Sequence, residues 1–211
     1  MLKKHRNSQK RIIFEDACYF ATSKTHYNYP YFRERIFCDL FVENLRMCKR
    51  LKGFLLYGWV LNYDHFHLLI QPSDKFNISD VMFSIKKQFA HDVNRIMGFN
   101  KPYPPDLEAG KRLPASSGDR CLLSDGIQQM IDKHQDYVNQ LSHTFQQKYA
   151  NGHPFPKFRW QGSFFDEYMR NDHEFNNFLD YIDYNPTKHH LPIVWQYLYL
   201  NPEYDDLNDE I

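Results

Sequence analysis

The sequence predicts an α+β domain in which helices back an antiparallel sheet. Its predicted elements follow the order strand, helix, strand, strand, helix, and a short Asn/Asp-containing break joins the two central strands, as in a β-hairpin. The chain has 211 residues, of which 42% are hydrophobic and 25% charged. This length can bury a full core, and the composition excludes a disordered or coiled-coil chain as a whole.

The first predicted elements are a strand at 17–22 and a helix at 39–51. The strand segment is rich in β-forming residues. In the helix, apolar residues recur at steps of four and three, which places them on one face, and Gly53 ends it. These apolar residues are Phe41, Leu45, Cys48 and Leu51.

The next elements are the hairpin and a second helix. Apolar runs at 54–61 and 65–70 flank the break at 62–64. The helix begins at Ser79 as its cap, ends at Gly98, and has an apolar face. This order of strands and helices along the chain predicts a ferredoxin-like order of the strands in the sheet.

A helical insertion is expected at about 99–156, within a single domain that spans 1–211. Several prolines mark loops at both of its ends, and an amphipathic stretch runs through 128–150. We expect this segment to be dispensable for the core fold. Its role, a partner surface or a contact in a homodimer, stays open.

The C-terminal part predicts one more strand and a final helix. The strand lies within 158–166, and Asn171, with a glutamate three positions later, is a capping box that opens the helix. Pro186 disfavours helical geometry at the residue before it, so the helix should end near Asn185. An acidic tail is expected at about 196–211.

Charge and composition limit the function classes. The formal net charge is zero, which argues against a protein that coats nucleic acid by bulk electrostatics. Aromatic residues make up 17% of the chain, which suits a tightly packed core, base stacking or both. The four cysteines form no C-x-x-C pair, which is typical of reduced thiols, and no apolar run is long enough to span a membrane. These features predict a cytoplasmic protein.

His65 and His67 are the first candidates for chemistry. They are separated by one residue on a predicted strand, so both imidazoles project from the same face. Two imidazoles on a rigid strand can hold a divalent metal if another element supplies a third ligand. The alternative, two histidines that only form hydrogen bonds or face solvent, is about as well supported by the pair alone.

A second cluster lies at the end of the final helix. Tyr181 and Asn185 are four residues apart and therefore share one helical face. The Asn185 amide oxygen could complete a metal shell, with the Tyr181 phenol nearby. By itself, however, this segment is better explained as an aromatic helix end that packs on the core.

Taken together, these motifs resemble the single-tyrosine HUH transposases of the insertion-sequence type, above all their REP-associated branch. The resemblance lies in Gly58-Trp-Val-Leu-Asn-Tyr-Asp-His-Phe-His-Leu-Leu69 and in Tyr181-Ile-Asp-Tyr-Asn-Pro-Thr-Lys188, supported by 160–166. It covers about residues 15–98 and 157–195. The run Asn62-Tyr63-Asp64 departs from the Pro-Asn or Pro-Glu usual in that family before the histidine pair.

The resemblance implies a fold, a reaction and a set of residues. It makes His65, His67 and Asn185 ligands of Mg²⁺ or Mn²⁺, and Tyr181 the nucleophile. The implied reaction is cleavage and rejoining of single-stranded or hairpin DNA through a 5′-phosphotyrosine, which is the chemistry of DNA transposition and recombination.

Two other functions stay open. One is a catalytically idle module that binds DNA or RNA hairpins, and the other is a metal-dependent phosphodiesterase that uses water. In any of these, we expect nucleic acid to contact a set of basic and aromatic residues, Lys86, Lys87, Arg159, Trp160 and Arg170.

Overall fold

Five strands form one antiparallel sheet in the order β4-β1-β3-β2-β5. The computed structural model describes residues 13–14, 16–103 and 125–201. The strands are β1 Tyr19–Lys24, β2 Leu55–Leu61, β3 His65–Gln71, β4 Phe165–Tyr168 and β5 Leu198–Leu200. The helices are α1 Arg35–Lys52, α2 Ile78–Ile96, α3 Asp125–Lys148 and α4 Asp172–Lys188. The predicted α+β class with a ferredoxin-like strand order is confirmed, with β5 added beyond β2.

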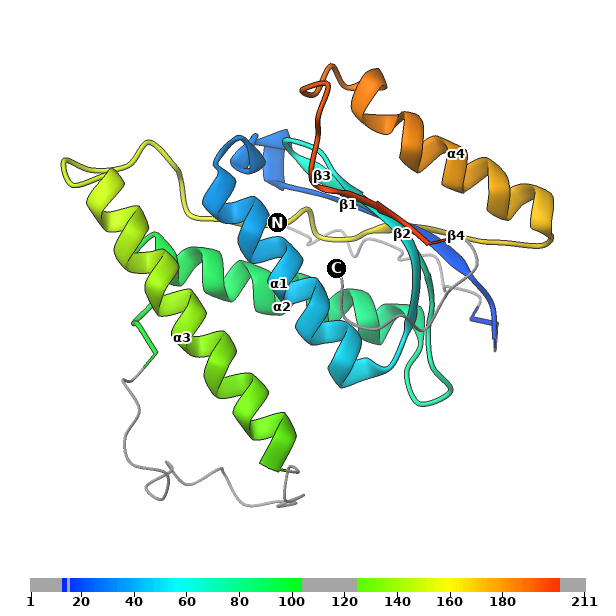
Figure 1. The fold of residues 1–211 in the computed structure, drawn as a ribbon, viewed down its shortest axis with the longest axis horizontal. Coiled ribbons are helices and arrows are strands. Elements are labelled where there is room, and N and C mark those ends of the chain that lie inside the picture. The colour runs from blue at the N-terminus through cyan, green and yellow to red at the C-terminus, as the bar shows by residue number, and fades with distance from the viewer. Residues whose placement is uncertain (1–12, 15, 104–124, 202–211) are drawn as a thin grey trace, which may run out of the picture.

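The sheet separates two layers of helices. Helices α1, α2 and α3 lie on one side, and α4 lies alone on the other (Figure 1). Because side chains alternate along a strand, Phe66 and Leu68 of β3 enter the main core under α1 and α2, while Leu69 packs toward α4. The histidines of β3 have the same parity as Leu69, so the sheet presents them to the α4 side.

Helix α3 packs into the main core, which argues against the expectation that the segment 99–156 is dispensable for the core fold. Val138 and Phe145 of α3 are buried, and the Phe145 ring centroid lies 5.6 Å from that of Phe37 on α1. The prediction placed this helix correctly along the sequence. Its partners are distant in sequence, so the local pattern gave no indication that it would pack there.

The ends of α1 and α2 follow local chemistry. Gly53 takes the left-handed conformation with φ of 64° after α1, as its place behind the apolar repeat predicted. Helix α2 is capped by Asn77 instead of Ser79, because the Asn77 side chain accepts hydrogen bonds from the backbone N–H groups of Ser79 and Asp80. The cap therefore lies two residues earlier than expected.

Helix α4 begins as predicted and ends later. The Asn171 side chain accepts a hydrogen bond from the Glu174 N–H, which confirms it as the cap. The Glu174 carboxylate accepts from the Arg170 N–H, so the predicted capping box is only half formed. The helix continues through Pro186 to Lys188, three residues past the expected end at Asn185. Pro186 lies in the last turn, so its missing N–H removes one hydrogen bond while the following residues complete the turn.

Part of the expected acidic tail is a strand. Residues Leu198–Leu200 pair with 58–60 of β2, whereas 202–211 lie outside the described residues. A Cβ built on Gly58 would meet Leu200 Cδ2 at 3.2 Å, and Ile182 Cδ1 and the Tyr199 carbonyl oxygen at 3.3 Å. The glycine therefore lets both β5 and α4 approach β2 closely.

Three of the four cysteines can be placed. Cys18, Cys38 and Cys48 are free thiols, and burial raises the pKa of Cys18 and Cys48 to about 12, which makes them poor nucleophiles. Cys121 lies outside the described residues. In the part of the chain that the structure describes, no helix has both the length and the apolar character of a membrane span.

Candidate active site

The hairpin between β2 and β3 delivers the two histidines to the α4 side of the sheet. The Asn62 N–H donates to the His65 carbonyl oxygen at 2.7 Å, which closes the turn immediately before the pair. The two rings lie 5.0 Å apart between centroids, and each residue is only 5% exposed. The strand thus holds two imidazoles side by side in a buried position.

Each histidine is held through its Nδ1 atom. His65 Nδ1 lies 2.6 Å from Asp64 Oδ1, and His67 Nδ1 lies 2.7 Å from the Thr22 hydroxyl of β1. His67 Nε2 is buried and has no hydrogen-bond partner among the described residues. Contacts of this kind at Nδ1 orient an imidazole so that Nε2 can serve as a metal ligand.

The charge states of His67 and Asp64 suit a pair of histidines that ligates a metal ion. Burial, followed by the neighbouring His65, lowers the pKa of His67 to about 2, so its ring is neutral at physiological pH. Burial of Asp64 opposes its ionisation, but the hydrogen bond and charge interaction with His65 hold the pKa of its carboxyl below the ordinary value. A carboxylate at Asp64 favours the proton of His65 on Nδ1 and leaves Nε2 with its lone pair.

Tyr181 of α4 lies against the second histidine. Its ring centroid is 5.2 Å from that of His67, in an edge-to-face arrangement. Lys188, two turns further along α4, donates to the Tyr181 hydroxyl at 3.2 Å. Tyr184 is 61% exposed. Of the two tyrosines, Tyr181 is therefore the one beside the histidine pair.

Asn185 is fully buried one turn after Tyr181. Its Oδ1 accepts a hydrogen bond from Asn62 Nδ2 at 2.6 Å, and its Nδ2 has no partner among the described residues. The other amide of this pair, Asn62, likewise has one buried atom without a partner among the described residues, its Oδ1. The structure thus brings Asn185 to the hairpin that carries the histidines.

The donor set fits a divalent ion only if an amide takes part. Among the described residues, no three side chains of His, Cys, Asp or Glu are grouped so that they could hold a metal ion. The partnerless His67 Nε2 is the atom that an ion would satisfy. Two imidazoles and an amide oxygen from Asn185 are a donor set for a divalent ion of the later first-row type.

His189 is a site neighbour that the sequence reasoning missed. Its ring centroid lies 4.9 Å from that of His65, and burial, followed by His65, lowers its pKa. It follows Asn185 by four residues and Tyr181 by eight, which is the spacing of one helical face. That periodicity was visible in the sequence, but it could be used only once the helix was known to continue past Pro186.

The expected nucleic-acid contacts are spread over the molecule. Lys86 Nζ donates to the carbonyl oxygens of Gln161 and Ser163, and the Trp160 ring packs on Phe66 while its Nε1 donates to the Lys86 carbonyl. Both therefore hold the chain before β4 in place. The other three are a lysine on α2, a residue beside the end of β1 and a residue beyond β4, namely Lys87, Arg159 and Arg170.

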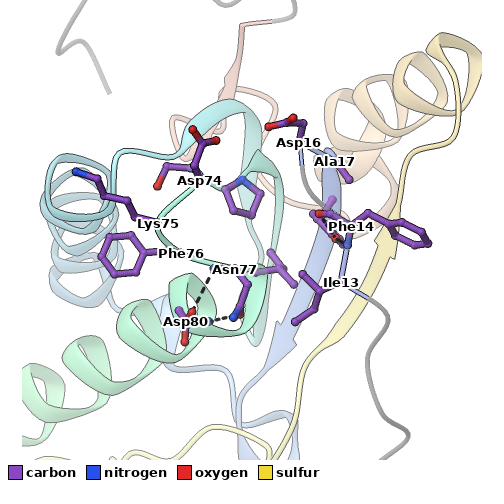
Figure 2. Close-up of a pocket in the computed structure, with 13 residues that line it drawn as sticks. Ile13, Phe14, Asp16, Ala17, Asp74, Lys75, Phe76, Asn77 and Asp80 are labelled. Atoms are coloured by element: carbon purple, nitrogen blue, oxygen red, sulfur yellow. Dashed lines mark hydrogen bonds between the residues drawn. The ribbon is translucent and has the colours of Figure 1, made fainter.

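One cavity of the described residues lies away from this site. This cavity has a volume of about 570 Å³. It lies between the chain before β1 and the start of α2 (Figure 2). Pro72, which directly follows β3, lines it, so it lies at the opposite end of that strand from His65. The side chains of Asn77 and Asp80 already satisfy the N–H groups there.

Comparison with known proteins agrees with this fold. Residues 18–101 match the family model described as "Transposase IS200 like". The match agrees with the resemblance over this span, which includes the histidine pair. Tyr181 and Asn185 lie beyond it. No curated protein sequence matches the chain.

Two solved structures are similar to the chain. The REP-associated tyrosine transposase bound to a REP hairpin has a TM-score of 0.55 at 16% identity, covering 90% of this chain and 79% of the other. A protein assigned as a transposase from Deinococcus radiodurans R1 has a TM-score of 0.40 at 15% identity, covering 90% of this chain and 100% of the other. The first likeness shows that the fold is shared.

Proposed function

We propose that this protein cleaves and rejoins single-stranded DNA, with Tyr181 as the nucleophile. The observation that carries the proposal is the position of the Tyr181 phenol, beside His67 of a buried histidine pair and within hydrogen-bond distance of the Lys188 ammonium. The family match over residues 18–101 supports a transposase-like protein, and the further mechanism rests on these contacts.

In the proposed step, Tyr181 Oη attacks the scissile phosphorus. The Oη–P bond forms, the bond from phosphorus to the 3′ oxygen breaks, the phenol proton passes to water, and the 3′ oxygen takes up a proton from water. The DNA 5′ phosphate stays on Tyr181, and a free 3′ hydroxyl is released. Because a phenolate is a good leaving group, attack by a 3′ hydroxyl reverses the step without a nucleoside triphosphate.

Lys188 has a defined task in this scheme. Its ammonium group donates to the phenol oxygen and lies 4.6 Å from the ring centroid. A positive charge at this distance stabilises negative charge that develops on Oη when the proton leaves and when the reaction reverses.

His65, His67 and Asn185 are the residues that would hold Mg²⁺ or Mn²⁺. A bound ion would neutralise the non-bridging phosphate oxygens and orient the phosphorus toward Tyr181. The chain itself supplies the rigid strand, the Nδ1 contacts from Asp64 and Thr22, and the exclusion of water around His67. These contacts fix the ligand atoms before DNA arrives.

The DNA substrate is proposed to carry a hairpin. The similar REP-associated transposase was solved with a REP hairpin, and the aromatic content of this chain can supply base stacking. A single strand that folds back on itself also exposes unpaired flanks to the sheet.

The test uses a DNA hairpin with randomised single-stranded flanks, incubated with Mn²⁺ and resolved on a denaturing gel. DNA labelled at its 3′ end should give a labelled protein adduct, and DNA labelled at its 5′ end should give a shorter free product. Tyr181→Phe should lose the adduct, while Tyr184→Phe, its exposed neighbour, should keep it.

Other outcomes would select the alternatives. Hairpin binding with no cleavage under any divalent ion would indicate an idle binding module. Cleavage that persists in Tyr181→Phe, with no adduct in the parent, would indicate a phosphodiesterase that uses water.

A further inference from the structure

An exposed row of polar and basic side chains continues the histidine face beyond β1. Thr25 forms an antiparallel bridge with Trp160, the Gln161 N–H donates to the Lys24 carbonyl at 2.9 Å, and the His26 N–H donates to the Arg159 carbonyl at 2.8 Å. The chain at 159–161 therefore runs beside the end of β1 like an additional strand.

Alternation along these two segments sets which side chains share a face. Thr25 is fully buried, and Trp160 packs on Phe66, so this pair faces the main core. Its neighbours on both segments project to the other face, which is the face of His65 and His67. These neighbours are Lys24, His26, Arg159 and Gln161, and all four are exposed.

The row starts directly beside the candidate active site. Lys24 is the cross-strand partner of His65, and the Thr25 N–H donates to the Asp64 carbonyl at 2.8 Å. A DNA strand whose phosphate lies at the histidines and continues along this face would next meet Lys24, and then Arg159.

Tyr27, at the end of the row, combines an exposed side chain with an unfavourable backbone conformation. Its side chain is 87% exposed, and its φ of 56° is in the left-handed region, which costs a non-glycine residue about 1 to 2 kcal/mol. The His26 ring packs on it at 4.0 Å between centroids. The fold gains little buried surface from this tyrosine and holds its ring out in solvent, an arrangement typical of functional positions.

We propose that Lys24, Arg159 and Tyr27 form a track for the single-stranded DNA that flanks the scissile phosphate. The two basic side chains contact successive phosphates, and the Tyr27 ring stacks on an unpaired base. This inference rests on the proposed function, because it continues the strand from the histidine pair. A paired base inside a duplex could not offer its face to Tyr27, so the track selects single strands.

The experiment measures binding in the Tyr181→Phe background, where no adduct can form, with fluorescein-labelled oligodeoxythymidylate of twenty bases as the probe. Fluorescence anisotropy gives the affinity over a series of salt concentrations. Tyr27→Gly should weaken binding about 5- to 100-fold, whereas Tyr27→Phe, which keeps the ring, should bind like the parent. Lys24→Gln combined with Arg159→Gln should reduce the slope of log affinity against log salt by about 1.4.

The control is an exposed aromatic residue of α2. Phe83 is 64% exposed, on the opposite side of the sheet from the histidines. Phe83→Ala should leave affinity and salt slope unchanged. A loss in this control that matches the loss in the track variants would overturn the proposal.

Stability separates a binding role of Tyr27 from a structural one. Glycine accepts a φ of 56° without strain, so Tyr27→Gly should melt at the same temperature as the parent or higher while it binds DNA less well. A lower melting temperature together with unchanged binding would refute the track, as would failure of the Tyr181→Phe parent to bind the probe at low salt. Failure of the proposed function would be seen in a different assay, because the unmodified protein would then form no covalent adduct with DNA.

Discussion

His134 Nε2 lies 2.9 Å from Asp92 Oδ2, and both side chains are buried between α2 and α3. Asp92 also accepts hydrogen bonds from Gln88 and from the Tyr103 hydroxyl. Burial opposes the ionisation of Asp92, but the hydrogen bond from His134 and its other partners hold the pKa of this carboxyl below the ordinary value. A charged group in the core therefore depends on a helix that the sequence marked as an insertion.

Loss of the His134 side chain should destabilise the fold. His134→Ala leaves the buried Asp92 carboxylate without its histidine partner, and such losses cost about 3 kcal/mol. Urea unfolding followed by circular dichroism measures the free energy of unfolding. His143→Ala, at an exposed position of the same helix, is the matched control and should stay within about 0.5 kcal/mol of the parent. Equal stabilities of the two variants would contradict this account of the pair.

Phe145 should contribute to stability as a core residue. Phe145→Ala removes a buried ring that contacts Phe37, and we expect a loss of about 3 to 5 kcal/mol. Phe83→Ala, an exposed phenylalanine on α2, should cost less than about 0.5 kcal/mol in the same urea experiment.

Because α3 packs in the core, a chain that joins Gly98 directly to Lys157 should fail to fold. A cooperative unfolding transition in that chain would show that α3 is dispensable.

Acid should weaken the fold through Glu34 at the start of α1. Burial opposes its ionisation, but hydrogen bonds from Lys148 and Tyr149 hold its pKa below 4.5. The unfolded chain therefore binds this proton more readily, so the contribution is present above about pH 4.5 and is lost as the pH falls through the folded pKa. Glu34→Gln should lower the free energy of unfolding by about 1 to 2 kcal/mol at pH 7, since Lys148 is half exposed.

Unfolding of both proteins at pH 7, 5, 4 and 3 checks the direction of this effect. The difference between the parent and Glu34→Gln should shrink as the pH falls. A difference that grows toward low pH would mean that the carboxylate does not stabilise the folded state.

The proposed metal site should bind Mn²⁺ more tightly than Mg²⁺, because imidazole nitrogens favour later transition metals over hard ions. Calorimetric titration should show Mn²⁺ binding that His65→Ala and His67→Ala each abolish. His173→Ala, an exposed histidine on α4, should bind like the parent. Undiminished binding by either strand variant would remove the site from His65 and His67, independently of any cleavage assay.

Local patterns sufficed for most of the fold. The hairpin, the Gly53 end of α1 and the Asn171 cap of α4 each depend on residues that are close in sequence, and all three were predicted. Strand β5 was missed because three residues of a short edge strand carry little signal and pair with Gly58, far away along the chain. The packing of α3 was missed for the same reason, since its partners lie on α1 and α2.

The candidate site shows the same division. The spacing of His65 and His67, and of Tyr181 and Asn185, follows from strand and helix periodicity, and the structure adds that Tyr181 packs on His67. The positions of Lys188 and His189 near the site could not be predicted, because they depend on α4 continuing through Pro186. The local rule for the residue before a proline argues against such a continuation. The roles of the metal ligands and of the nucleophile stay predictions.

Gly58 links the architecture to the geometry of the proposed reaction. Helix α4 rests on β2 through Ile182, the residue next to Tyr181, at a point where a single methyl group on Gly58 would force its neighbours back by a few tenths of an ångström. Such a shift is small for a core that can repack, but it is large for an in-line attack on phosphorus, where bond formation depends steeply on distance. Because Gly58 has no side chain, α4 can lie close to β2, and this distance sets the position of Tyr181 in the proposed reaction. Selection on catalysis would therefore also act on Gly58, although it is not one of the proposed catalytic or metal-binding residues.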